Sequence, residues 1–297
     1  MAYTSAALTF QAAGNREDLT DILTQISPID TPMFSRFKKT KAKGTLHEWL
    51  TESLTAAAEN KNVEGADFSF STPTARTRVG NYSQIFLKTL EVSGTQEVVD
   101  KAGLDSEFSH RMENLMKEIA RDVEYQYVNG ASASGASGTA RELNGVLSFI
   151  STNNETGSGT GTQALTETLY NDLLQTVYAA GGNPDTTYAN GWQKRKISAF
   201  STPSTRNISA EDKRITAAVD IYESDFGMQE ILLDRYMSTD TVACLEDDKW
   251  ATAILRPFET VEVAKAADSI RGAIVGELTL ECLNEVANGK ITELSTS

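Results

Sequence analysis

The chain has 297 residues, of which 40% are apolar and 23% charged, and this composition predicts a globular protein with a sizeable core. Its formal net charge of −14 argues against a dedicated reader of nucleic acid, although it is compatible with a protein that encloses nucleic acid without gripping it. No apolar run reaches about 18 residues, and no basic residue precedes Arg16, so we expect neither a membrane span nor a signal peptide.

The first 40 residues are predicted to form an arm. Asn15 is a suitable cap for a short helix, and Pro28 and Pro32 then favour extended backbone. Apolar side chains such as Met33 and Phe37 have little core of their own in this segment. We expect them to be buried against something outside the arm.

A basic stretch ends the arm in a chain that is otherwise acidic. Such a stretch is either a solvated linker or a surface that meets acidic patches on neighbouring copies. Two arginines farther along the chain and a histidine on the predicted long helix are further candidates for contacts between subunits. The candidate residues are Arg36, Lys38, Lys39, Lys41, Lys43, Arg76, Arg78 and His110.

Residues 44–90 are predicted to form a long two-stranded excursion. The returning strand alternates in places, with Ile85 and Leu87 opposite in phase to Phe86 and Lys88. Between the strands lies a segment rich in alanine, glycine and asparagine. Because a bare hairpin of this length is marginally stable in water, we expect it to pack on its own domain or on another subunit.

The strongest helix signal covers residues 104–128. Its apolar side chains recur every three or four residues from Phe108 to Val123, and Glu107 is placed to pair with Arg111. Asp105 or Ser106 is a suitable N-cap, and Asn129-Gly130 is a typical end. This helix is about 36 Å long, roughly twice the usual length in globular proteins.

The rest of the chain mixes helices with strands and then becomes rich in strands. Helices are predicted over 163–180 and 192–200, and a short strand is predicted between them. Residues 214–237 favour two strands around a turn at Asp225-Phe226-Gly227. Near the C-terminus we expect two longer strands, the first broken by Pro257, and a turn at Asn288-Gly289.

Glu107 and His110 have the Glu-x-x-His spacing of ligands in di-iron helix bundles. That site needs a second such pair, but the chain has only one other histidine, His47, in a strand-like region. Neither cysteine has the charged setting of a nucleophile, so we expect Cys244 and Cys282 to be buried thiols in a reducing compartment. We predict no cofactor, no metal and no enzyme activity. The alternative is a soluble α/β enzyme with carboxylate or helical metal chemistry around Glu107 and His110.

Three stretches together resemble the major capsid proteins of tailed bacteriophages with the Hong Kong 97-type fold. The first is "NREDLTDILTQISPIDTPMFS" (15–35), the second is "GGNPDTTYANGWQKRKISAF" (181–200), and the third is the segment 255–291. The resemblance covers nearly the whole chain. It implies an α+β fold with an N-terminal arm, an extended loop that reaches over a neighbour, a long spine helix in a peripheral domain, and an α/β axial domain.

The resemblance also divides the chain and implies a function. It implies a head protein that self-assembles into pentamers and hexamers of an icosahedral shell around double-stranded DNA in the virion. The implied partners are other copies of the same chain, a portal protein, and decoration or scaffolding proteins, and no membrane is involved. A different polymerising surface protein is a further alternative. The expected ranges are 1–40 for the arm, 41–90 for the extended loop, 91–160 for the peripheral domain, 161–240 for the axial domain and 241–297 for the return strands of the peripheral domain.

Overall fold

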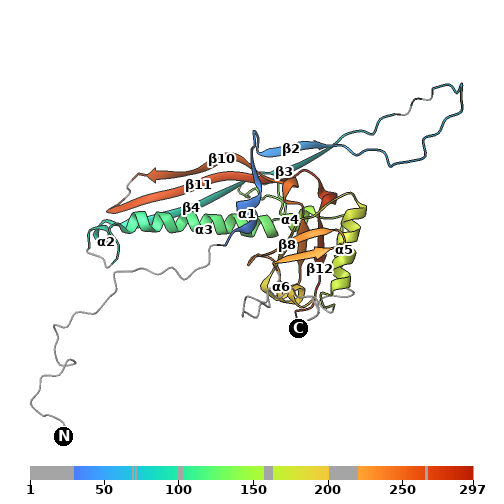
Figure 1. The fold of residues 1–297 in the computed structure, drawn as a ribbon. Helices are drawn as coiled ribbons and strands as arrows, with labels where there is room; N and C mark the ends of the chain where they lie inside the picture. Colours follow the sequence, from blue (N-terminus) through green and yellow to red (C-terminus); the bar gives the residue numbers. More distant parts are fainter. Residues whose placement is uncertain are drawn as a thin grey trace, which may run out of the picture.

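The computed structural model describes residues 30–68, 70, 72–99, 103–156, 163–200, 220–264 and 267–296. A long helix lies along one sheet, a second sheet packs beside it, and a two-stranded hairpin projects from the body (Figure 1). The predicted helix after Asn15 lies outside the described residues. The helices are α1 (Pro32–Arg36), α2 (Gly94–Val98), α3 (Glu107–Asn129), α4 (Val146–Phe149), α5 (Glu167–Ala179) and α6 (Gly191–Ser198), with short 3₁₀ turns η2 (Asp247–Lys249) and η3 (Glu285–Ala287).

Twelve strands fall into three sheets among the described residues. They are β1 (Lys38–Lys41), β2 (Leu46–Thr51), β3 (Thr77–Tyr82), β4 (Gln84–Ser93), β5 (Asn154–Thr156), β6 (Thr186–Ala189), β7 (Ile221–Ser224), β8 (Gly227–Leu233), β9 (Val242–Leu245), β10 (Trp250–Val263), β11 (Ser269–Cys282) and β12 (Gly289–Thr292). The sheet orders are β1-β10-β11-β4, β5-β12-β9-β6-β8-β7, and β2-β3.

The predicted long helix is confirmed as α3. The Ser106 side chain caps its start by accepting the N–H of Ser109 at 3.2 Å, and Gly130 ends it. The helix lies on the four-stranded sheet (Figure 1), and Gly272 of β11 allows the close approach. A Cβ atom at Gly272 would lie 2.4 Å from Cε of Met112 and 2.7 Å from Cζ of Phe108. One face of β11 and β4 is therefore covered by α3, and the alternate side chains form an outer face.

Pro257 does not break the strand that contains it. β10 continues from Trp250 to Val263, with register shifts against β11 between Ile254 and Glu259. The parallel neighbour β1 pairs only with Ala251–Ile254, so Pro257 lies where β10 is an edge strand on that side. A proline is tolerated there because no ladder hydrogen bond from its nitrogen is required.

The six-stranded sheet brings together segments from the middle and the end of the chain. β6 is buried along its whole length between β8 and β9, and α5 packs against β12. The predicted helices near 163–180 and 192–200 correspond to α5 and α6, and the turn at Asp225-Phe226 joins β7 to β8. β9 and β12 join this sheet, whereas β10 and β11 pair with β4 in the four-stranded sheet. The expected domain ranges stay predictions.

The predicted excursion over 44–90 also divides between two sheets. β2 and β3 pair with each other from Leu46 opposite Tyr82 to Thr51 opposite Thr77. β4 instead pairs along its whole length with β11 and belongs to the four-stranded sheet. The division occurs at Ser83, whose hydroxyl donates to Oε1 of Glu277 at 2.6 Å. The hairpin with its loop is thus confined to residues 46–82.

Candidate assembly surfaces

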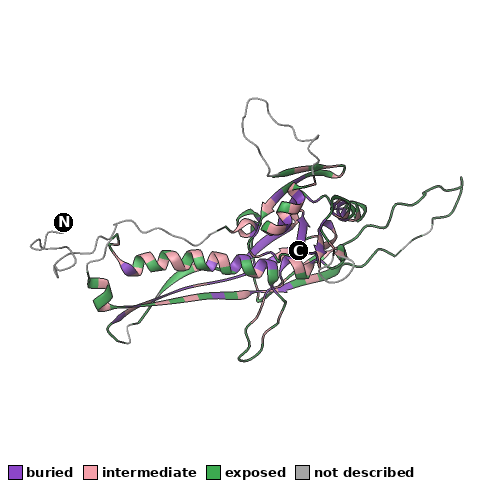
Figure 2. Cartoon of the chain, turned by 90° about the horizontal axis from the view of Figure 1, so that it is seen from below, coloured by how far each residue is buried: buried purple, intermediate pink, exposed green. Residues whose placement is uncertain are grey.

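The segment between β2 and β3 exposes large apolar side chains far from the core. Its described residues between 52 and 76 contain neither helix nor strand, and all of them are exposed. The segment extends well beyond the body (Figure 2). Four of its large apolar side chains are between 81% and 95% exposed, namely Leu54, Val63, Phe68 and Phe70. Monomeric soluble proteins rarely present such a group, so this segment, which we call the apolar loop (52–76), has the properties of an interaction element.

The base of this hairpin is firmly anchored even though its loop is not. The buried Asn81 side chain donates to the carbonyl of Leu280 at 2.8 Å and accepts the N–H of Asn144 at 2.7 Å. His47 lies 3.3 Å from Oε2 of Glu281, and its ring packs against Trp49. The hairpin therefore leaves the body in a defined direction, and this fixes where the apolar loop begins.

The outer face of the four-stranded sheet is a second exposed apolar surface. Strand register places Leu87 beside Val275, and Ala273 beside Val261. Four large side chains on this face are between 42% and 57% exposed, namely Ile85, Leu87, Val261 and Val263. We call this group the outer sheet patch. The alternation at Ile85 and Leu87 signalled it in the sequence, but which side α3 would cover was not readable there.

The end of the arm is built into the body of its own chain. Met33 and Phe37 are fully buried, and the Phe37 ring stacks on Trp250 with centroids 5.8 Å apart. Arg36 pairs with Asp247 at 2.8 Å and with Glu230 at 2.7 Å. The hydrogen bond to Glu230 raises the pKa of the Arg36 guanidinium, and burial only partly opposes this. We expected these apolar side chains to be buried against something outside the arm, and residues of the same chain bury them.

Some of the basic side chains predicted to contact other subunits have partners within their own chain, and others do not. Lys38 pairs with Asp248 at 2.7 Å, and Lys39 lies over the Phe34 ring at 5.4 Å, so these side chains, like Arg36, have partners in the same chain. Arg76 and Arg78 pair with glutamates across the hairpin. Lys41 and Lys43 are exposed and form no ion pair with any residue that the structure describes. That these basic side chains contact a neighbouring copy stays a prediction.

Glu107 and His110 do not form a ligand pair. The Glu107 carboxylate is buried and pairs with Arg111, as predicted from their spacing. His110 lies 3.1 Å from the Asn114 amide nitrogen. Within the described ranges no group of three or more histidine, cysteine, aspartate or glutamate side chains is arranged to hold a metal. The same part of the chain contains no helix long and apolar enough to cross a membrane.

Sequence reasoning missed one buried carboxylate on α3. Glu124 is fully buried, and its two oxygens accept the N–H groups of Met33 and Phe34, each at 2.8 Å. Burial raises the pKa of Glu124 to about 8, and the nearby Asp234 acts in the same direction. In the sequence Glu124 only adjoins the apolar stripe at Val123, and nothing there marks it as an acceptor for a segment 90 residues away.

The fold is the Hong Kong 97-like capsid fold. The capsid of a native GTA particle aligns with a TM-score of 0.70 at 11% identity, covering 99% of this chain and 100% of that chain. A structure from Mycobacterium phage Adephagia aligns with a TM-score of 0.66 at 9% identity, covering 97% and 98%. The mixed α+β architecture with the long helix α3 is the one that the sequence resemblance implied.

The chain belongs to the family described as SU10 major capsid protein, whose profile matches residues 2–295. It is also 22% identical to the major capsid protein of Escherichia phage Phieco32, over 97% of both sequences. It is therefore a structural protein of the virion that forms icosahedral shells of tailed phages, and it is not an enzyme. The alternative of a soluble α/β enzyme built around Glu107 and His110 is therefore wrong.

Proposed function

We propose that this chain assembles into pentamers and hexamers by laying its apolar loop on the outer sheet patch of a neighbouring copy. The observation that supports this is the presence of two separate apolar surfaces on one chain. The apolar loop projects from one end of the molecule, whereas the sheet that carries the outer patch extends toward the other (Figure 1). A contact between two different surfaces is heterologous, and heterologous contacts close into rings when the rotation allows.

The energy available from such a contact offsets much of the cost of association. Full burial of one large apolar side chain contributes roughly 1.5–3 kcal/mol. The apolar loop offers four such side chains, which are almost fully exposed in the single chain. Association itself costs roughly 4–15 kcal/mol in lost freedom of motion. The loop contact is therefore an essential contribution, and the remaining interfaces of the ring supply the surplus.

The charge of the chain suits a container for DNA. With a net charge of −14, the shell adheres only weakly to an enclosed polyanion, because tight binding requires clustered basic side chains that release counterions. We therefore propose that double-stranded DNA is enclosed without sequence-specific contacts. Lys41 and Lys43, exposed beside the root of the hairpin, are the basic side chains we assign to contacts between copies. A portal protein, and decoration or scaffolding proteins, are proposed on family resemblance alone.

The test is assembly of a chain with Leu54, Phe68 and Phe70 replaced by serine. We expect the circular dichroism spectrum and thermal midpoint of the unassembled protein to stay unchanged, because these side chains are exposed there. Losing three apolar contacts raises the protein concentration needed for capsomer formation by roughly a thousandfold or more, given about 1.4 kcal/mol per factor of ten. Sedimentation velocity and electron microscopy measure this.

A matched control is Glu64→Gln, which changes a polar exposed side chain of the same loop. We expect it to assemble like the wild-type chain. Shortening the loop over 52–72 extends the test, since it should spare the folded body and impair assembly. Normal shells from the triple serine variant or from the shortened chain would show that the apolar loop is not the principal contact.

A further inference from the structure

The arm root, residues 30–37, is held on α3 through its backbone. Glu124 presents both carboxyl oxygens to the N–H groups of Met33 and Phe34, each at 2.8 Å. The carboxyl group is inaccessible to water, and Met33 beside it is equally buried. Since Pro32 has no N–H, these are the first two amides of α1 that require an acceptor. The Glu124 side chain of α3 therefore accepts hydrogen bonds from both of these backbone N–H groups of the arm root.

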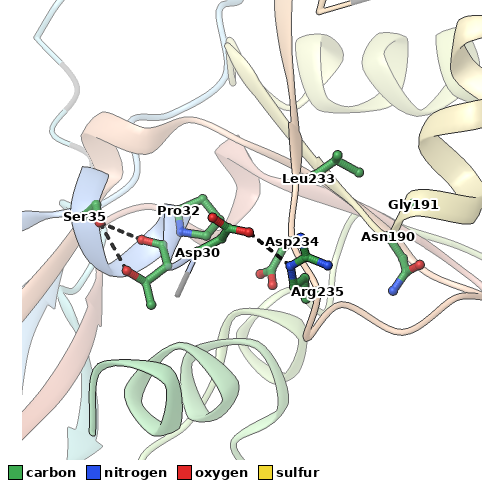
Figure 3. A pocket seen from close by; sticks show the side chains of 9 residues that line it. Asp30, Pro32, Ser35, Asn190, Gly191, Leu233, Asp234 and Arg235 are labelled. Atoms are coloured by element: carbon green, nitrogen blue, oxygen red, sulfur yellow. Dashed lines mark hydrogen bonds and ion pairs between the residues drawn. The ribbon is translucent and has the colours of Figure 1, made fainter. Parts of the chain in front are cut away.

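A second buried carboxyl group faces Glu124 from the segment after β8. Asp234 is 1% exposed; its Oδ1 accepts the N–H of Tyr236 at 2.8 Å, and its Oδ2 has no hydrogen-bond partner. It lines a cavity of about 730 Å³ together with residues of the arm root, and Figure 3 shows the pair Asp30–Arg235 beside it. Two carboxyl groups thus lie under the arm root.

No cationic side chain among the described residues forms an ion pair with either carboxyl group. The two nearby arginines have other partners: Arg235 pairs with Asp30 at 3.0 Å, and Arg121 donates to the Tyr236 hydroxyl at 3.0 Å. The remaining titratable groups that face Glu124 are the phenols of Tyr127 on α3 and Tyr188 on β6. Burial raises the pKa of both phenols, so they stay neutral at ordinary pH.

We propose that Glu124 and Asp234 form a proton-dependent latch that holds the arm root on α3 while at least one of them is protonated and loosens when both are ionised. The arrangement of two buried carboxyl groups without a counter-cation supports this, because burying an unpaired charge is costly. Release of the arm root exposes Glu124 to water and removes that cost. The latch is a property of the single chain and does not depend on the proposed loop contact.

The direction of the pH dependence follows from the two carboxyl groups. Burial raises the pKa of Glu124 to about 8 and that of Asp234 to about 6, both above the values of exposed carboxyl groups near 4. The N–H groups of Met33 and Phe34 on Glu124, and of Tyr236 and Met237 on Asp234, lower these pKa values, but burial is the larger effect. In the released arm root Glu124 has its ordinary pKa, so release sets a proton free between about pH 4.5 and 8. The latch is therefore strongest below that window and weakens as pH rises through it.

The experiment is hydrogen exchange of the full-length chain at pH 6, 7 and 8, followed in peptides that contain Met33 and Phe34. After correction for the intrinsic exchange rate, we expect the opening equilibrium of these amides to rise about tenfold per pH unit, as for release of one proton. Glu124→Gln removes the titrating group, so its opening equilibrium should not vary with pH. Glu113→Gln, an exposed position on the same helix, should behave like the wild-type chain.

Asp234→Asn provides an independent variant if the Glu124 substitution prevents folding. It removes the neighbouring charge, which lowers the pKa of Glu124 and moves the pH-dependent window downward. Corrected opening of Met33 and Phe34 that does not change from pH 6 to 8 in the wild-type chain would overturn the proposal. So would a pH slope in Glu124→Gln equal to that of the wild type, or an unshifted window in Asp234→Asn.

Discussion

Replacing Gly145 by alanine should destabilise the protein by about 1–3 kcal/mol. Gly145 precedes α4 and lies against the end of α3, where its N–H donates to the carbonyl of Gly130 at 3.0 Å. A Cβ atom there would lie 2.6 Å from the Gly130 nitrogen and 2.9 Å from the Tyr127 carbonyl oxygen. Both are backbone atoms of a packed segment, so neither can rotate away as a side chain would.

The magnitude follows from three contributions. Overpacking a dense site costs about 1–3 kcal/mol, and weakening the Gly145–Gly130 hydrogen bond costs about 0.5–1.5 kcal/mol. Alanine also restricts the conformations of the unfolded chain, and this stabilises the folded protein by about 0.4–1 kcal/mol. Because Gly145 has a φ of −88°, which alanine adopts freely, no backbone strain adds to this.

Urea unfolding followed by far-ultraviolet circular dichroism measures the effect. The matched control is Gly191→Ala at the start of α6, where no heavy atom lies within 4 Å of the added Cβ. That variant should be stabilised by about 0.4–1 kcal/mol, because alanine at an unstrained position reduces the conformational freedom of the unfolded chain. If the Gly145 variant unfolds within about 0.5 kcal/mol of wild type, or if the Gly191 variant is equally damaged, the close-contact argument is refuted.

Two further predictions concern the core. Ile119→Pro, in the buried middle of α3, costs about 3 kcal/mol or more against a total stability of about 5–15 kcal/mol, so we expect no soluble folded protein; a soluble variant with wild-type ellipticity would contradict this. Burial raises the pKa of the Cys244 thiol to about 11 and that of Cys282 to about 12, so Ellman's reagent at pH 8 should label both quickly in urea and neither in the native protein; rapid native labelling would show that a thiol is accessible.

Local patterns were enough to predict the long helix. Its apolar spacing, the cap at Ser106 and the end at Gly130 are interactions between residues close in the chain, and the structure confirms each of them. The pair Glu107–Arg111 is likewise local. The alternation of the C-terminal strands was readable for the same reason, because side chains of one strand face alternate sides whatever the strand pairs with.

Long-range pairing decided what the local pattern left open. From the sequence we predicted that residues 44–90 form one two-stranded excursion. In the structure β4 instead pairs with β11, whose residues lie about 180 positions later in the chain. Pro257 predicted a break in its strand, but β10 continues through it because the neighbouring strand β1 ends before that position. Neither outcome depends on propensities within the segment itself.

The arm shows the same distinction in its energetics. Its apolar side chains predicted that it must be buried somewhere, and this is a statement about composition that the sequence alone could make. Where it is buried depends on Glu124, Asp247 and Trp250, which lie roughly 90 to 215 residues away in the chain. Burial, and with it the raised pKa of Glu124, exists only once those segments meet, because desolvation is a property of the packed surroundings and not of the residue.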